Sequence, residues 1–181
     1  MRITTGKIKG KEIKLSKKLR NVVRPTKSLI RNSMFEVIGS RINGSKCLDL
    51  FCGTGVIGLE AYSRGARKVT LVDKRNILIK KIKKFLRKNN IVGIRCEAID
   101  YVKFIRNSSE KYNILFLDPP YNLFHKQDKL VSLCSCLLKS NGIIYLENYK
   151  SNLKEDINFR GFKNIKIGTN GRIIYFLLIK I

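Results

Sequence analysis

The sequence predicts an α/β fold built on a mostly parallel sheet, and three observations support this fold class. From residue 46 onwards, short apolar runs alternate with longer segments that have helical periodicity. A glycine-rich turn joins the first apolar run to a helix, a frequent strand-to-helix connection in α/β folds. Near the C-terminus, Asn170-Gly171 separates two apolar runs, which indicates that the sheet ends in an antiparallel hairpin.

Length and charge set the first limits on organisation and function. The 181 residues correspond to one domain with at most a short extension, and a hydrophobic content of 44% is enough for a core. Lys and Arg number 38 against 13 Asp and Glu, which gives a net charge of +25 spread along the whole chain. This excess predicts a polyanionic partner. Nucleic acid is favoured over the alternative, compositional drift in a sequence rich in Ile and Asn.

The hydropathy pattern and the cysteine spacing disfavour membrane and metal functions. The apolar run 173–179 is too short to cross a membrane, and the basic N-terminus has no apolar stretch typical of a secretory signal. We therefore expect a cytoplasmic protein with no membrane association. The five cysteines lack the spacing of a metal site, so we expect reduced thiols and no bound metal.

Residues 1–40 form the first predicted unit, an N-terminal extension of a hairpin and a helix. Residues 2–15 alternate around two glycines, which indicates a short, basic β-hairpin. Its lysines, including Lys7 and Lys9, can contact phosphates of a nucleic acid. The alternative is that they only keep a sheet edge solvated.

The helix of this extension follows Arg24-Pro25-Thr26. Thr26 can cap its N-terminus, and apolar residues recur along the segment that follows at helical spacing. Most of this helix is expected to pack against the rest of the chain. Arg24 and Arg31 are the candidates for contact with RNA or substrate.

Residues 41–181 form the second predicted unit, which contains the sheet. The strand 47–51 runs into three glycines that satisfy the pattern G-x-G-x-x-G, namely Gly53, Gly55 and Gly58. A second strand, 69–73, ends in Asp73 about twenty residues after Gly53, a spacing that fits a carboxylate bound to a ribose diol. Together these features predict a cofactor that contains a nucleoside.

A helix over 74–90 and a third strand over 93–98 continue the alternation. The helix carries many lysines opposite its apolar face, which are read as a solvated face with secondary phosphate contact as the alternative. Asp100 then stands at the head of a helix over 101–105. It can cap that helix, accept a hydrogen bond from an adenine amine, or do both.

The fourth strand, 112–117, ends at Asp118-Pro119-Pro120-Tyr121. Two prolines stop the strand, so a carboxylate and an aromatic ring are displayed at the ligand edge of the sheet. The Asp118 carboxylate and the Pro119 carbonyl can hold both hydrogens of an exocyclic nucleobase amine and aim its lone pair at an electrophile. Tyr121 can stack on the base. The alternative is a plain turn with a helix-capping Asp.

The chain is expected to finish with a helix over 127–139, a fifth strand over 143–147 that ends in Glu147, and the antiparallel pair 162–167 and 172–179. Two cofactors fit the glycine turn and Asp73. A nicotinamide dehydrogenase leaves the Asp118 tetrad and the charge unexplained. S-adenosylmethionine accounts for both the tetrad and the charge, because its methyl group can be transferred to an amine of a nucleic acid. Its ribose would bind at Asp73, its adenine at Asp100, and its methionine moiety along Asp49.

The ordered motifs resemble a known family. Residues 48–55 are similar to the cofactor motif of class I methyltransferases, and 118–121 to their amino-methyltransferase motif, (D/N)PP(Y/F). With Arg2-Ile3, 6–10, 24–26 and 58–66, they resemble the RsmD family, enzymes that methylate the N2 amine of a guanine in 16S ribosomal RNA. The resemblance covers almost the whole chain.

This resemblance implies a seven-stranded Rossmann-like sheet, with the N-terminal extension on the RNA side. It implies catalytic roles for Asp118, Pro119, Pro120 and Tyr121, and cofactor contacts from Asp49, Phe51, Gly53, Thr54, Gly55, Asp73 and Asp100. The RNA contacts would come from Lys7, Lys9, Arg24, Thr26 and Arg31. The chain departs from the family mildly, with Cys52 where Ala is usual and Asp73 where Glu is common.

The expected function is therefore S-adenosylmethionine-dependent methylation of a guanine N2 amine, with 16S ribosomal RNA or the small ribosomal subunit as partner. One alternative is an amino-methyltransferase of adenine or cytosine in DNA, although the chain leaves no room for a target-recognition domain. The other is a basic RNA-binding module without turnover, which the intact tetrad disfavours.

Overall fold

The computed structural model describes residues 2–14, 28–120, 123, 126–152 and 159–181. Among the sequence-predicted site residues, Arg24, Thr26 and Tyr121 lie outside this part of the chain. The strands are β1 (Lys46–Asp49), β2 (Lys68–Val72), β3 (Ile94–Glu97), β4 (Tyr112–Leu117), β5 (Leu138–Tyr149), β6 (Phe162–Asn170) and β7 (Ile173–Lys180). The helices are α2 (Ser28–Ile38), α3 (Val56–Ser63), α4 (Asn76–Lys88), α5 (Tyr101–Asn107) and α6 (Gln127–Ser135), with short 3₁₀ turns η1 (Gly39–Ile42) and η3 (Lys150–Asn152).

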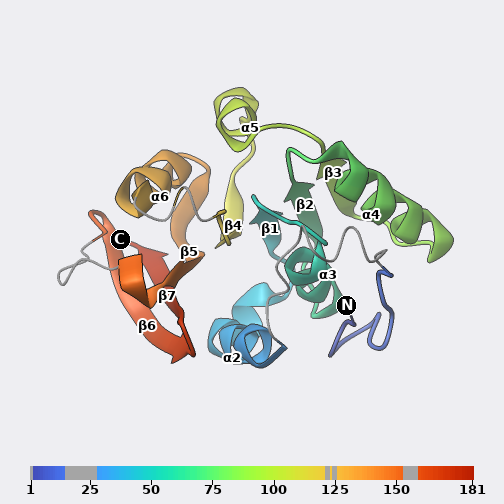
Figure 1. Cartoon of the computed structure of the whole chain (residues 1–181), viewed down its shortest axis with the longest axis horizontal. Helices are drawn as coiled ribbons and strands as arrows, with labels where there is room; N and C mark the ends of the chain where they lie inside the picture. Colours follow the sequence, from blue (N-terminus) through green and yellow to red (C-terminus); the bar gives the residue numbers. More distant parts are fainter. Residues whose placement is uncertain (1, 15–27, 121–122, 124–125, 153–158) are drawn as a thin grey trace.

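The strands form one seven-stranded sheet in the order β3-β2-β1-β4-β5-β7-β6. The first five strands in this order pair in parallel, while β7 is antiparallel to both β5 and β6. Figure 1 shows β3 and α4 at one end of the sheet, and β6 and β7 at the other. This confirms the predicted parallel sheet and its C-terminal antiparallel hairpin.

The order of strands reverses between β1 and β4, which follow each other in space but not in the chain. In open α/β sheets such a switch point leaves a crevice at the carboxyl ends of the two strands, where ligands bind. Asp49 and Asp118 stand at the carboxyl ends of these two strands. The topology therefore brings two of the predicted site residues to one place.

Two hydrophobic clusters cover the two faces of the sheet. One joins apolar residues of α2, α3 and α4 to the sheet, and it also contains Ile3, Ile8 and Ile13 from the N-terminal segment. The other joins α5 and α6 to the opposite face. Alternate side chains of each central strand point to opposite clusters. The proposed N-terminal extension shares the first of these clusters with the sheet.

Three elements differ from the sequence expectation. The N-terminal segment has one antiparallel bridge, Arg2 to Glu12, instead of a hairpin of two strands. Helix α6 ends at Ser135, and β5 begins at Leu138 because this part of the chain pairs with Tyr112. The next paired residues are Ile114 and Ile143, so residues 139–142 bulge out, with Asn141 at a φ of 56°. None of the helices in the described part of the chain is long and apolar enough to span a membrane.

Candidate functional site

Three carboxylates meet at the carboxyl ends of neighbouring strands: Asp73 after β2, Asp49 at the end of β1 and Asp118 after β4. Asp49 is almost completely buried, and burial raises the pKa of its carboxyl to about 8. A hydrogen bond from the Gly58 backbone N–H (3.1 Å) opposes this rise, whereas the negative charges of Asp118 and Asp73 add to it. Their influence on one buried group places all three carboxylates in the same region.

The glycine turn has the backbone that its motif requires. Gly53 and Gly55 have φ of 53° and 77°, in the left-handed region that favours glycine, and Gly55 is the N-cap of α3. A Cβ on Gly58 would lie 2.2 Å from Leu71 Cδ2, so this glycine lets α3 pack directly against β2. The third glycine therefore serves helix packing, and the first two shape the turn.

Asp73 is joined to this turn and to Arg75. Its Oδ2 accepts hydrogen bonds from Gly53 N–H (2.9 Å) and Arg75 Nη2 (2.7 Å), while its Oδ1 accepts from Arg75 Nε (2.8 Å) and from the Arg75 backbone (2.9 Å). Burial favours a higher pKa for Asp73, but the bonds and charge of Arg75, together with Gly53 N–H, outweigh it and lower the pKa. Asp73 is thus an ionised carboxylate at the predicted ribose position.

Asp100 caps α5, which is one of the two roles expected for it. Its Oδ1 accepts a hydrogen bond from Val102 N–H (2.9 Å). The next residue, Tyr101, contacts the ring of Phe51 with 5.1 Å between the centroids. Phe51 lies between β1 and the glycine turn in the chain, so this contact of two half-buried rings joins the start of α5 to the segment that leads into the turn. Thr54, inside the turn, is buried.

The Asp118 tetrad ends β4 as predicted, and the structure describes its first three residues. Asp118 is half-buried, Pro119 is buried and Pro120 is exposed, with the Pro120 carbonyl accepting a hydrogen bond from Leu123 N–H (2.9 Å). Below it, the Tyr145 hydroxyl donates to Glu147 Oε2 (2.8 Å) in a fully buried pair. Burial, with Glu147 and Asp118 adding to it, raises the pKa of Tyr145 well above its ordinary value. Tyr145 is therefore a neutral donor next to these carboxylates.

Asn148, near the end of β5, is a candidate site residue that the sequence reasoning did not single out. It is completely buried, and neither its Nδ2 nor its Oδ1 has a hydrogen-bond partner among the residues that the structure describes. It stands two positions beyond Leu146, and Pro119 stands two beyond Leu117, the residue paired with Leu146. A buried amide without partners is destabilising, and such groups are typical of functional sites. The only signal in the sequence is a polar residue within an apolar strand.

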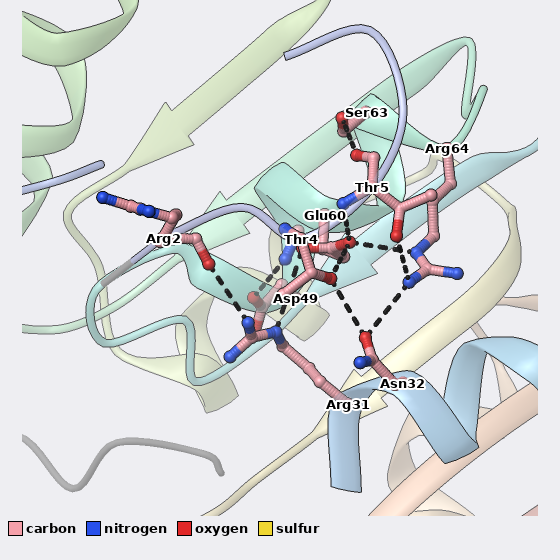
Figure 2. A network of polar contacts seen from close by, with 10 residues as sticks. Arg2, Thr4, Thr5, Arg31, Asn32, Asp49, Glu60, Ser63 and Arg64 are labelled. Atoms are coloured by element: carbon pink, nitrogen blue, oxygen red, sulfur yellow. Dashed lines mark hydrogen bonds and ion pairs between the residues drawn. The ribbon is translucent and has the colours of Figure 1, made fainter. Parts of the chain in front are cut away.

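The N-terminal segment docks through a second set of polar residues (Figure 2). Glu60 of α3 has no exposed surface, and it accepts hydrogen bonds from Thr4 N–H (2.9 Å), Thr4 Oγ1 (2.7 Å) and Thr5 N–H (3.0 Å). It also pairs with Arg64 (3.1 Å) and Arg31 (3.9 Å). This network holds the N-terminal segment and α2 against α3. Its carboxylate, Glu60, belongs to the motif of residues 58–66.

Arg31, a predicted RNA contact, belongs to this network. Only 3% of the residue is exposed, its Nη2 donates to the Arg2 carbonyl (3.2 Å), and burial lowers its pKa. Its guanidinium therefore faces Glu60 rather than solvent. The position supports a role in holding the N-terminal segment, and contact of Arg31 with RNA stays a prediction.

Of the predicted lysines, Lys7 and Lys9 are exposed. The Lys7 ammonium lies 3.6 Å from the centroid of the Tyr62 ring, and the Lys7 N–H donates to the Ser63 carbonyl. Gly6 permits this approach, because a Cβ there would lie 1.9 Å from the Ser63 carbonyl oxygen and its φ is 82°. Lys7 is thus fixed on α3, whereas Lys9 extends to solvent.

Comparison with known proteins assigns the family. The family model described as Conserved hypothetical protein 95 matches residues 1–178. A Buchnera aphidicola (subsp. Acyrthosiphon pisum) protein named Ribosomal RNA small subunit methyltransferase D is 39% identical over 153 residues, which cover 82% of this chain and 78% of that protein. The chain belongs to this family, the RsmD family. The resemblance inferred from the motifs is therefore confirmed.

A further relative agrees in sequence, and two solved structures agree in fold. The Haemophilus influenzae protein of the same name is 31% identical over 161 residues, covering 86% of this chain and 82% of that protein. A Haemophilus influenzae structure described as a methylase superimposes with a TM-score of 0.81 at 26% identity, covering 99% and 98% of the two chains. The Escherichia coli protein yhhF, described as a methyltransferase, gives 0.87 at 23% identity, covering 99% and 97%. The fold is that of class I methyltransferases.

Proposed function

We propose that this RsmD-family protein transfers a methyl group from S-adenosylmethionine to the exocyclic N2 amine of a guanine in small-subunit ribosomal RNA. The observation that carries the proposal is the meeting of Asp73, Asp49 and Asp118 at the switch point of the sheet. Two of these carboxylates stand on the cofactor side, and the third begins the amine-binding tetrad. Relatives that carry the name Ribosomal RNA small subunit methyltransferase D support the substrate class.

The residues present fit S-adenosylmethionine. Gly53 and Gly55 provide the left-handed backbone of a tight turn at the head of α3, Asp73 offers an ionised carboxylate for ribose, and Asp100 and Phe51 are the proposed adenine contacts. When bound, the cofactor supplies an electrophilic methyl group on a sulfonium. The protein therefore needs to bind and orient the two reactants, which accounts for much of the rate in such reactions.

On the substrate side, Asp118 and the Pro119 carbonyl accept the two hydrogens of the amine. The amine nitrogen then presents its lone pair towards the cofactor, and Tyr121 stacks on the extruded base. Methylation removes one proton from the amine, and the Asp118 carboxylate is the group positioned to receive it. The buried Tyr145 lies close enough to Asp118 to be affected by its charge and keeps its own proton.

Asn148 supports the choice of guanine over the other bases. Only guanine carries a ring N–H next to its exocyclic amine, whereas adenine and cytosine present an unprotonated ring nitrogen there. Asn148 continues the face of β5 that carries Leu146, whereas Asp118 continues the face of β4 that carries Phe116, so we propose that the base spans the end of β4, with the Asn148 Oδ1 accepting from this N1–H and its Nδ2 donating to O6. This pairing would satisfy both amide atoms, for which the described part of the chain provides no partner.

We take residues 1–40 as the RNA-side extension and 41–181 as the methyltransferase domain. Small-subunit RNA, free or in the assembled subunit, is the partner, and a cytoplasmic location follows from this substrate. Arg24 and Thr26, which precede α2 in the sequence, remain proposed RNA contacts together with Lys7 and Lys9. The alternatives are a DNA adenine or cytosine methyltransferase and a non-catalytic RNA-binding module.

One experiment distinguishes these functions. The protein is incubated with methyl-labelled S-adenosylmethionine and either unmodified small ribosomal subunits or duplex DNA. Label in the 16S RNA supports the proposal. Label only in DNA supports a DNA methyltransferase, and cofactor binding without transfer to either substrate supports a binding module.

A further inference from the structure

Helix α4 presents an outward face that is basic along its whole length. The buried side of the helix consists of Leu78, Ile79, Ile82 and Leu86. Five cations on the other side are exposed, namely Lys80, Lys83, Lys84, Arg87 and Lys88. The helix contains no acidic residue, so cations at i and i+4 face each other and repel. Within the described residues none of these five forms an ion pair, although surface helices usually alternate the signs of their charges. A polyanion would relieve this repulsion.

Beside this face lies an open groove of about 600 Å³. Lys83, Arg87 and Asn90 line one side of it, and Ile91 and Val92 supply apolar surface, with 78% of Val92 exposed. Cations beside a wide, exposed apolar surface fit a polynucleotide, because the cations meet phosphates while the apolar surface meets a sugar or an unstacked base.

The groove is separate from the catalytic edge but continuous with the N-terminal lysines. Strand β3 is three strands from β4 in the sheet order, roughly 14 Å at the usual strand spacing, and the groove lies at the amino end of β3, so it is separated from the carboxyl edge by a further strand length. The Lys11 Nζ donates to Asn89 Oδ1 (2.8 Å) at the end of α4, which joins the N-terminal segment to the groove. Lys9 and Lys11 therefore extend the same basic surface towards α3.

We propose that this groove, between the end of α4 and β3, binds the phosphate backbone of RNA that flanks the methylated nucleotide. The inference rests on the proposed function for the identity of the polyanion. It assigns to α4 a role beyond covering the sheet. The Asp118 tetrad reads the target base, and the α4 groove holds a neighbouring part of the same RNA.

The test compares two double variants that each remove two positive charges. Lys83→Gln with Arg87→Gln changes the groove, and Lys163→Gln with Lys166→Gln changes exposed lysines on β6 at the opposite end of the sheet (Figure 1). The probe is in-vitro-transcribed 16S RNA, whose binding is measured over a series of salt concentrations. S-adenosylmethionine binding serves as the check that both variants are folded.

We expect the groove variant to bind RNA at least tenfold more weakly and to reduce the slope of log Kd against log salt by about 1.5, near the value for two lost phosphate contacts. The β6 variant should change the slope by much less. Equal losses of RNA binding in both variants would mean that only the total charge matters. Unchanged RNA binding in the groove variant would mean that the groove does not contact RNA. Either result overturns the proposal. Methyl transfer by the unmodified protein is measured in parallel. If methyl transfer is absent but RNA binding is lost only in the groove variant, the proposed function is rejected and the RNA-binding role of the groove is retained.

Discussion

Arg75 and Gly53 fill the acceptor positions of Asp73. Two hydrogen bonds reach Oδ1 and two reach Oδ2, at 2.7 to 2.9 Å, and a carboxylate offers about four such positions. Two of the four come from the Arg75 side chain. A ribose diol that binds Asp73 must therefore replace the guanidinium of Arg75, while the two backbone donors stay.

Arg75→Met should consequently bind S-adenosylmethionine more tightly than the unmodified protein. The Arg75 side chain is about one-third exposed, so its ion pair is weak and the gain should be about two- to fivefold in Kd, measured by calorimetry. Arg95→Met, which removes the Arg95–Glu97 pair (2.6 Å) on the neighbouring strand, is the matched control and should leave Kd unchanged. Weaker binding in Arg75→Met would show that Arg75 contacts the cofactor instead of competing with it.

Asp49 should make stability depend on pH. Its pKa is raised from 3.8 to about 8, so between these values the native state holds a proton that the unfolded chain has released. Stability relative to Asp49→Asn should then fall as pH rises from about 5 to 8, by at most about 1.4 kcal/mol per pH unit, and level off above. Denaturant unfolding of the cofactor-free protein at several pH values measures this, with Asp128→Asn at an exposed site as control. A constant difference between the protein and Asp49→Asn would mean that Asp49 is ionised throughout.

The sequence predicted the order of elements and the carboxylates of the site because both depend on local patterns. Strand β4 has the predicted bounds, and Asp73, Asp100 and Asp118 occupy the predicted ends of their elements. The environment of a side chain depends on long-range packing, which periodicity does not report. From the sequence, Arg31 is predicted to be a surface cation. In the structure it is buried against Glu60, which lies 29 residues later in the chain. Asn148 likewise reads as one polar residue in a strand until its lack of partners is seen.

Glu60→Gln should destabilise the protein strongly. It leaves Arg31 buried without an opposite charge and weakens the hold on Thr4 and Thr5, so a loss of about 3 kcal/mol is expected in the free energy of unfolding. Glu110→Gln removes a pair with Lys46 (2.9 Å) whose side chains are about one quarter exposed, and this variant should lose less than about 1 kcal/mol. Similar losses in the two variants would show that the network around Glu60 is no stronger than a surface pair.

Asn148→Leu should stabilise the fold and impair the enzyme. Replacing a buried amide that has no partner among the described residues by an apolar side chain of similar size should raise the free energy of unfolding by about 1 kcal/mol. Loss of the proposed contact with guanine should lower methyl transfer by about tenfold. Asn164→Leu, at an exposed position of β6, should do neither. If Asn148→Leu transferred methyl groups at the normal rate, the amide would have no part in reading the base.

The central claim is that Asp118 positions a guanine N2 amine of 16S RNA for methylation, and nucleoside analysis of the product tests it most directly. Unmodified small subunits are incubated with S-adenosylmethionine and either the natural protein or Asp118→Ala, and the RNA is then digested and analysed by mass spectrometry. We predict N2-methylguanosine with the natural protein and less than about a hundredth of that amount with Asp118→Ala, which should still bind the cofactor. A methylated adenosine or cytidine, or near-normal N2-methylguanosine with Asp118→Ala, would contradict the account.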